Sequence, residues 1–284
     1  MKKKFLALIG ATVMTLACGL TACGSNDTLV VYTEAGFAPF EYVSDGKIVG
    51  VDVDIMNKVG EKLGKKVVFE NVNFDTIIDA VAEGKLTNVG AAGISRRPDR
   101  EAKVDFSKDY YTASLYVIYP AEKEATYVSQ TTDNVGGVYW DSLVNCNIAV
   151  QKGTTADLFL SDEIAEGGTL WDEATGKATA QKTGFDALSG AMADVGLNCQ
   201  VLIIDELPAK SLIKGKDNFA CAPLYYKGSE ATETEEAVPD EAAVDTYAIC
   251  VTKGQTELLN AINAVLDELG EEGIQALVNK HLGL

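Results

Sequence analysis

The sequence predicts an α/β protein with two lobes that are joined by two extended crossover strands. A strand–helix–strand–helix–strand order occupies residues 29–93, and a similar order recurs in residues 148–205. Two further β-rich segments, 110–119 and 246–251, flank the second unit, as the two strands of a hinge would. Strands that alternate with helices indicate sheets that are rich in parallel pairs and covered on both faces. The 284 residues are enough for two such lobes.

In the first unit, three runs of β-branched, aromatic or small residues predict strands: Leu29–Thr33, Val67–Glu70 and Val89–Gly93. Apolar residues spaced three and four positions apart predict a helix between each pair of strands. Asp54 is the expected N-cap of the first helix, and Gly64 is its expected end. Asp75 is the expected N-cap of the second helix, which should end at Gly84.

The second unit follows the same order. Its predicted strands are Ile148–Gln151, Ala178–Lys182 and Val201–Asp205. Its predicted helices are Thr154–Leu160 and Asp186–Met192. A similar dipeptide stands before a helix at matching places in the two units, which is a weak internal repeat: Phe74-Asp75 and Phe185-Asp186. Helical periodicity then predicts two C-terminal helices, in residues 256–270 and 271–281.

The hinge segments also predict the limits of the lobes. Lobe 1 would comprise residues 29–112 and 247–284, and lobe 2 would comprise residues 113–246. The segment Ser229–Val244 contains five Glu, one Asp and no Lys or Arg. It has no large apolar residue beyond two valines, so we expect it to be a solvated surface loop.

The composition excludes several classes of function. Acidic residues outnumber basic ones by 42 to 24, and the formal net charge is −18. Nucleic-acid binding needs a basic stripe, so we expect no nucleic-acid partner. The chain has one histidine, His281, and no cluster of residues with metal-ligand spacing, so we expect neither a metal nor a cofactor.

The first residues are typical of an export signal. Three lysines, Lys2–Lys4, precede a short apolar run that ends in small residues. The tetrad Leu20-Thr21-Ala22-Cys23 resembles a bacterial lipobox, in which the cysteine is lipidated and becomes the first residue. We therefore expect residues 1–22 to be a lipoprotein signal peptide, Cys23 to be lipidated, and residues 23–28 to be a linker. A transmembrane anchor is the alternative, but it needs about 20 apolar residues.

The cysteines allow a disulfide outside the cytosol. Cys18 is a weaker alternative site of lipidation, and four cysteines remain beyond Cys23: Cys146, Cys199, Cys221 and Cys250. Cys146 and Cys199 each stand just before a predicted strand. They could form a disulfide if those strands are neighbours in a parallel sheet, and buried free thiols are the open alternative.

Candidate ligand-binding residues stand where predicted strands end, because open parallel sheets bind ligands at the carboxyl ends of their strands. Gly93-Ile94-Ser95 offers backbone amides and a hydroxyl after the third strand. Arg100 follows closely, and a guanidinium can hold a carboxylate through two parallel hydrogen bonds. A surface salt bridge is the alternative role of Arg100.

The second unit offers the complementary chemistry. Thr154 and Thr155 stand between a strand and a helix, where they could bind an anion or cap the helix. Asp205 ends the strand Val201–Asp205 and could accept a hydrogen bond from an ammonium group, or it could cap the next helix. Three more residues could line the same cleft: Glu34, Phe37 and Phe74. A cation in one lobe and an anion in the other would fit a zwitterion.

At these positions the chain resembles the polar amino-acid substrate-binding proteins of ABC transporters, which are family 3 of the bacterial solute-binding proteins. The resemblance covers nearly all of the chain after the export signal, and the order of its motifs carries it. These motifs are Thr33–Glu41, Gly50–Ile55, Phe74-Asp75, Ala91–Ser95, Pro98–Arg100, Val104–Ser107, Tyr110-Tyr111, Gly153–Thr155 and Ile204–Glu206.

The resemblance implies a type II periplasmic-binding-protein-like fold that clamps a polar amino acid between its lobes and delivers it to the membrane subunits of an ABC importer. It implies that Arg100 grips the ligand carboxylate with Ser95 and the Gly93 backbone, and that Thr155 adds a contact from the other lobe. Asp205 would bind the ammonium, with Phe37 as an aromatic lid. The expected ligand-binding residues are Glu34, Phe37, Phe74, Ala92, Gly93, Ser95, Arg100, Thr154, Thr155 and Asp205.

Two other functions stay open. Some dehydratases resemble this fold, and Glu34 or Asp205 could supply acid–base chemistry. A ligand-sensing or adhesive lipoprotein is the other alternative. The expected location is extracytoplasmic, on the outer surface or in the periplasm, with a lipid anchor in the cell membrane. Arg96 and Arg97 stand where this family usually has an aliphatic residue and a threonine, so Arg96 either faces an acidic ligand or faces solvent.

Overall fold

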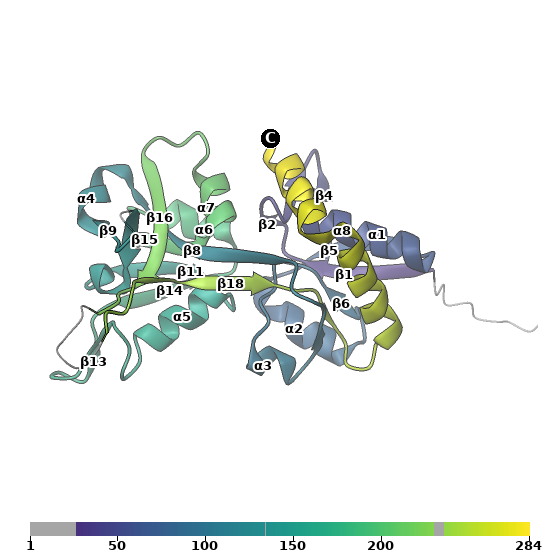
Figure 1. Cartoon of the computed structure of the whole chain (residues 1–284), viewed down its shortest axis with the longest axis horizontal. Coiled ribbons are helices and arrows are strands. Elements are labelled where there is room, and N and C mark those ends of the chain that lie inside the picture. Colours follow the sequence, from purple (N-terminus) through teal and green to yellow (C-terminus); the bar gives the residue numbers. More distant parts are fainter. Residues whose placement is uncertain (1–26, 134, 230–235) are drawn as a thin grey trace, which may run out of the picture.

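The computed structural model describes residues 27–133, 135–229 and 236–284, and it has two lobes. Two strands run from one lobe to the other through the centre of the molecule, β8 (Tyr111–Pro120) and β18 (Val244–Tyr247) (Figure 1). They pair antiparallel, with Tyr247 opposite Tyr111. The predicted two-stranded hinge is therefore confirmed. Its second strand begins and ends earlier than the sequence predicts.

Lobe 1 is built on a sheet with the strand order β5-β1-β6-β19-β7. Its first three strands are parallel to one another, and the last two are antiparallel to their neighbours. The strand bounds are β1 Thr28–Thr33, β5 Lys66–Asn71, β6 Val89–Gly90, β7 Asp105–Phe106 and β19 Cys250–Val251, with a small separate sheet of β2 Gly36–Phe37, β3 Glu41–Ser44 and β4 Lys47–Val49. The helices are α1 Val51–Leu63, α2 Phe74–Glu83, α3 Pro98–Glu101 and α8 Thr256–Leu282.

Lobe 2 is built on a sheet with the order β14-β11-β15-β8-β16-β10-β9. Parallel pairing joins β14, β11 and β15, whereas β8 runs antiparallel to both of its neighbours, so the sheets are mixed rather than uniformly parallel. The bounds are β9 Val128–Gln130, β10 Gly136–Tyr139, β11 Asn147–Gln151, β12 Trp171–Asp172, β13 Lys177–Ala178, β14 Gln181–Phe185, β15 Val201–Asp205, β16 Phe219–Tyr226 and β17 Glu241–Ala242. The helices are α4 Glu124–Tyr127, α5 Thr155–Glu163, α6 Leu188–Asp194 and α7 Glu206–Ile213, with 3₁₀ turns at Ala121–Lys123 and Trp140–Leu143.

Helix ends were predicted better than helix starts. Gly64 and Gly84 end α1 and α2 in the left-handed conformation, as expected. The predicted N-caps were wrong, because α1 begins after Gly50 and α2 begins after Asn73. Asp54 lies inside α1, where its carboxylate accepts from Lys280 and His281 of α8. Asp54 therefore ties the C-terminal helix to lobe 1.

Two predicted strands differ from the structure. The run Val89–Gly93 pairs only at Val89–Gly90, because the chain turns at Gly93, which has a φ of 54°. Instead of one strand at Ala178–Lys182, the structure has two: β13 ends at Ala178, and β14 begins at Gln181. The last two predicted helices do meet at Gly270, whose non-helical backbone (φ 58°, ψ −175°) divides α8 into two parts.

Both faces of the lobe 2 sheet are buried, as expected for a sheet covered on two sides. One apolar cluster contains Ile148, Val150, Val201 and Ile203, and another contains Ala149, Leu202 and Ile204.

The described helices include none that is long and apolar enough to cross a membrane. The predicted signal peptide and Cys23 lie outside the described residues, and the lobe limits at 112 and 246 stay a prediction.

Candidate functional site

A small cavity lies between the lobes. Nine of the ten expected ligand-binding residues line it, and Arg100 lies outside it. Two further residues that the sequence did not single out, Gln151 and Asp245, also line it. The full lining is Glu34, Phe37, Phe74, Ala92, Gly93, Ser95, Gln151, Thr154, Thr155, Asp205 and Asp245.

The cavity forms at the carboxyl ends of parallel strands, as expected for an open α/β sheet. Glu34 follows β1, and Ala92 to Ser95 follow β6, in lobe 1. Gln151 ends β11 and Asp205 ends β15, in lobe 2. Asp245 comes from the hinge strand β18. All three parts of the fold therefore contribute to one cavity.

The lobe 1 wall depends on Gly93. A Cβ at this position would lie 2.8 Å from the ring of Phe37, so a larger residue would push the ring away. The ring of Phe37 also packs against Phe40 and Tyr247, with centroids 5.9 and 6.0 Å apart. The Gly93 amide donates to Asp52 Oδ2 at 2.9 Å. This amide, expected to face a ligand, is thus already bonded to the protein.

Arg100 is buried beside the cavity rather than on its wall. Its side chain donates to the carbonyl oxygens of Ser95 in lobe 1 (2.8 Å) and Gly153 in lobe 2 (2.7 Å). Its guanidinium carbon lies 5.6 Å from the centre of the Phe74 ring. It lines a neighbouring cavity of about 530 Å³ with Asp99 and others. Burial lowers the pKa of Arg100, and the negative charge of Asp245 opposes this shift.

A chain of hydrogen bonds crosses the cavity from lobe 2 to the hinge. The Ser95 hydroxyl lies 2.6 Å from the Thr155 hydroxyl, and it donates to Oδ2 of Asp245. Because Ser95 has one hydroxyl proton, Thr155 must be the donor in the first of these bonds. Thr154 takes the helix-capping role, since its hydroxyl oxygen accepts from the Asp157 amide at 3.3 Å.

Two acids of the cavity have an unpartnered oxygen. Glu34 Oε2 and Asp205 Oδ1 are buried and have no hydrogen-bond partner among the described residues. Burial raises the pKa of Glu34, although hydrogen bonds from Gln151 and Gly36 oppose this. Burial raises the pKa of Asp205 to about 8, with a further contribution from the negative charge of Asp245. A buried carboxylate without a partner is costly, so both acids favour a cationic ligand.

A second layer of acids lies beneath the lobe 1 wall. Asp52 Oδ1 accepts from the Tyr110 hydroxyl at 2.5 Å, while its other oxygen holds Gly93. Glu41 is fully buried nearby, and neither of its carboxyl oxygens has a partner among the described residues. Burial raises the pKa of Glu41 well above its usual value, and the charge of Asp52 adds to this shift. Burial therefore favours the neutral form of Glu41.

Other expectations concern residues away from the cavity. Arg96 interacts with Asp109, Glu101 and the Ser107 carbonyl, so its side chain is held at the surface of lobe 1. The four described cysteines are free thiols. Cys146 and Cys199 are buried free thiols here and belong to different apolar clusters, and a disulfide between them stays a prediction.

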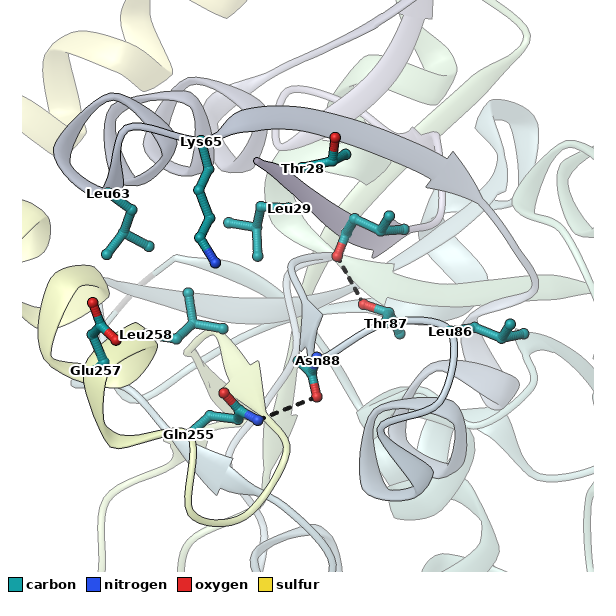
Figure 2. A pocket seen from close by; sticks show the side chains of 11 residues that line it. Thr28, Leu29, Leu63, Lys65, Leu86, Thr87, Asn88, Gln255, Glu257 and Leu258 are labelled. Carbon is teal, nitrogen blue, oxygen red and sulfur yellow. Dashed lines mark hydrogen bonds between the residues drawn. The ribbon is translucent and has the colours of Figure 1, made fainter. Parts of the chain in front are cut away.

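Another cavity, of about 210 Å³, lies at the opposite edge of lobe 1 (Figure 2). It is near the amino ends of β1 and β6, where Leu29, Thr87 and Asn88 surround it. The Lys65 side chain points into it, and Gln255 donates to Asn88 at 3.5 Å (Figure 2). Open parallel sheets bind ligands at the carboxyl ends of their strands, so we do not expect the ligand site at this edge. The described residues also contain no group of three or more acids, histidines or cysteines that could hold a metal ion.

The comparison with known proteins agrees with this geometry. Residues 29–284 match the model of the family described as bacterial extracellular solute-binding proteins, family 3. The arginine-binding extracellular protein ArtP of Bacillus subtilis is 25% identical, over 95% of this chain and 94% of that protein. A probable histidine-binding protein of Neisseria gonorrhoeae is 25% identical, over 96% and 92%.

A solved structure gives the same fold. The crystal structure of AbpA, an amino acid ABC transporter substrate-binding protein from Streptococcus pneumoniae bound to L-arginine, superposes with a TM-score of 0.72. The two chains are 24% identical, and the match covers 91% of this chain and 96% of the other. The predicted two-lobe, type II fold is confirmed.

Proposed function

Because this chain belongs to family 3 of the bacterial extracellular solute-binding proteins, we propose that it binds an amino acid with a cationic side chain for delivery to an ABC importer. Binding of a polar amino acid follows from the family and its curated members. The cationic side chain is the finer part of the proposal. It rests on the acids of the cavity.

One observation carries the proposal: two carboxylates of the same cavity each have a buried oxygen without a partner. The α-ammonium of an amino acid can satisfy one of them, and Asp205 is the better candidate because the family resemblance assigns it that role. Glu34 then still lacks a cation. A guanidinium, ammonium or imidazolium on the ligand side chain would supply it.

The relatives support this choice of ligand class. The curated names of two matched relatives specify arginine and histidine, both of which carry a basic side chain. Gln151 lies beside Glu34, where it offers amide groups to the same end of a ligand. A neutral polar side chain would leave the charge of Glu34 buried without compensation.

The same proposal covers location and the absence of catalysis. The family consists of binding proteins, so we infer a clamp that releases its ligand unchanged and not a dehydratase. The extracellular and periplasmic relatives support an extracytoplasmic location. Lipidation at Cys23 would hold the protein at the membrane next to its transporter, and a sensing lipoprotein remains the competing use of the same anchor.

Calorimetric titration with L-arginine and with L-citrulline, its neutral isostere, tests the ligand class. We expect arginine to bind at least tenfold more tightly, because a charge-assisted contact contributes about 1.5–3 kcal/mol. Glu34→Gln should remove most of this preference, whereas Glu70→Gln, at an exposed acid of the same lobe, should preserve it. Equal affinities of the wild-type protein for arginine and citrulline would contradict the cationic ligand, and binding of no amino acid would contradict the whole proposal.

A further inference from the structure

We propose that Asp245 is an internal competitor for the carboxylate subsite: its side chain contacts the groups expected to hold the ligand α-carboxylate and must turn away before an amino acid can bind. This inference rests on the proposed function, because it concerns the same cavity. If the proposal is right, Asp245 lowers the affinity for ligands that carry a carboxylate and does not lower the affinity for ligands that lack one.

The contacts of Asp245 place its carboxylate among the groups expected to hold the ligand carboxylate. Oδ2 accepts from the Ser95 hydroxyl, and the Thr155 hydroxyl lies next along the same chain of hydrogen bonds. Oδ1 accepts from the Thr246 amide at 2.8 Å. Arg100 supplies the nearby positive charge, to which Asp245 is the strongest attractive partner. Asp245 thus has the surroundings of a bound carboxylate.

A serine hydroxyl has one proton, so the Ser95 hydroxyl cannot donate to two carboxylates at once. While Asp245 accepts that proton, a ligand carboxylate that approached Ser95 would meet an oxygen lone pair and a second negative charge. Asp205 lines the same cavity, so Asp245 is not the only acid that a ligand carboxylate would approach. A ligand carboxylate can therefore bind Ser95 and Thr155 only after Asp245 has turned away.

Because the backbone of Asp245 lies in the hinge, its carboxylate can leave Ser95 by rotation of the side chain alone. The backbone of Asp245 is paired opposite Ala113 of β8, so the strand itself is held in the hinge. Its side chain reaches from the hinge to Ser95 of lobe 1, and through Ser95 to Thr155 of lobe 2. Rotation of one side chain would break this link between the lobes and free both hydroxyls.

The proposal distinguishes two chemical classes of ligand. An amino acid must displace Asp245, whereas an amine of the same shape without a carboxylate can leave Asp245 where it is and use it as an anionic partner. L-Arginine and agmatine form such a pair, because agmatine keeps the guanidinium and the amine but has no carboxylate. Asp245 should therefore weaken the binding of arginine and not that of agmatine.

The test is calorimetric titration of arginine and agmatine into the wild-type protein, Asp245→Asn and Asp99→Asn. Asp99 is a matched control, because it is an exposed acid that also attracts Arg100 but lies outside the cavity. We expect Asp245→Asn to bind arginine at least tenfold more tightly and agmatine equally or more weakly. Asp99→Asn should change each affinity less than twofold.

Three outcomes would overturn the inference. Weaker or unchanged arginine binding by Asp245→Asn would mean that Asp245 is a partner of the ligand or a bystander, and an equal gain in Asp99→Asn would mean a general effect of charge. If neither the wild-type protein nor Asp245→Asn bound any amino acid, the proposed function would fail as well. Circular dichroism checks folding, and Asp245→Ser, which also removes the charge, replaces the asparagine variant if that variant is misfolded.

Discussion

The two walls of the cavity are built differently. In lobe 2, Gln151 and Asp205 are the last residues of regular parallel strands, β11 and β15, over apolar clusters. In lobe 1, Gly93 and Ser95 belong to an irregular turn after a strand of two residues. That turn is held from beneath by Asp52, which bonds the Gly93 amide. Regular pairing fixes one wall, and buried polar contacts fix the other.

Because the two walls are built differently, they should respond differently to substitution and to pH. The wall in lobe 2 exposes one acid, Asp205, to the ligand, so changes there should alter binding directly. The wall in lobe 1 rests on Asp52 and Glu41, whose carboxyl groups lie beneath it. Changes in that layer should alter stability and its dependence on pH. Three predictions test this contrast.

Arg100→Ala should have the largest effect, because it removes a bridge between the two walls. Its guanidinium donates to one carbonyl oxygen in each lobe and supplies the positive charge beside the carboxylate subsite. As the proposed carboxylate anchor, Arg100 would also give the ligand charge-assisted hydrogen bonds of about 1.5–3 kcal/mol each, so we expect amino-acid affinity to fall about a hundredfold or more. Calorimetry measures this change. Lys103→Ala, at an exposed cation of the neighbouring cavity, is the control.

A small effect of Arg100→Ala would contradict the carboxylate anchor that the family resemblance implies. It would also show that contacts from Thr155 and the backbone suffice to hold the ligand. Arg100→Lys separates charge from geometry, because lysine keeps the charge but cannot reach both carbonyl oxygens with a planar fork.

The pH dependence of binding is the next largest effect, and it tests the wall in lobe 2. Burial raises the pKa of Asp205 to about 8, so this acid is mostly protonated at pH 6. An ammonium group binds the ionised form, and binding must then release a proton. We therefore expect amino-acid affinity to rise by up to about tenfold per pH unit from pH 6 to 8 and to level off above that. Asp205→Asn should bind weakly and without this slope.

Titrations in buffers of different ionisation enthalpy measure the released protons. A wild-type affinity that is constant from pH 6 to 8 would show that Asp205 is ionised before the ligand arrives. The negative charge of Asp245, which lines the same cavity, also raises the pKa of Asp205, so Asp245→Asn should shift the plateau to lower pH.

The contrast between the walls also explains what the sequence could predict. Thr154, Thr155 and Asp205 follow predicted strands, and a strand places its last residue at the sheet edge whatever the rest of the chain does. Gln151 was missed because it was counted only as the end of its strand. Its polar side chain at a carboxyl end was the available signal.

Asp245 could not be found in this way. It stands between the acidic loop and the predicted hinge segment, and its role depends on β18 passing Ser95, which is 150 residues away in the sequence. The position of Arg100 also depends on long-range contacts, because its second carbonyl partner, Gly153, belongs to the other lobe. The sequence therefore predicted the fold and the ends of strands, but not the contacts that close the cavity.

Glu41→Gln should have the smallest effect, and it tests the layer beneath lobe 1. Burial raises the pKa of Glu41 well above its usual value, so folding favours its neutral form. The stability from this group is present below the pKa of the unfolded chain and is lost as pH rises toward the folded pKa, at about 1.4 kcal/mol per pH unit. Glutamine is neutral throughout, so the unfolding free energy of the variant should fall less between pH 5 and 8. Urea unfolding without ligand measures both slopes.

The variant separates a buried neutral acid from a buried charge. If Glu41 is neutral in the folded protein, the glutamine variant should lose about 1 kcal/mol or less at pH 5, because its side chain has the same shape and no charge to compensate. At pH 8 it should equal or exceed the wild-type protein. Glu61→Gln, at an exposed acid of α1, should keep the wild-type slope. Equal slopes of unfolding free energy against pH for Glu41→Gln and the wild-type protein would mean that Glu41 is ionised when folded. The acids beneath the lobe 1 wall would then not make its stability depend on pH.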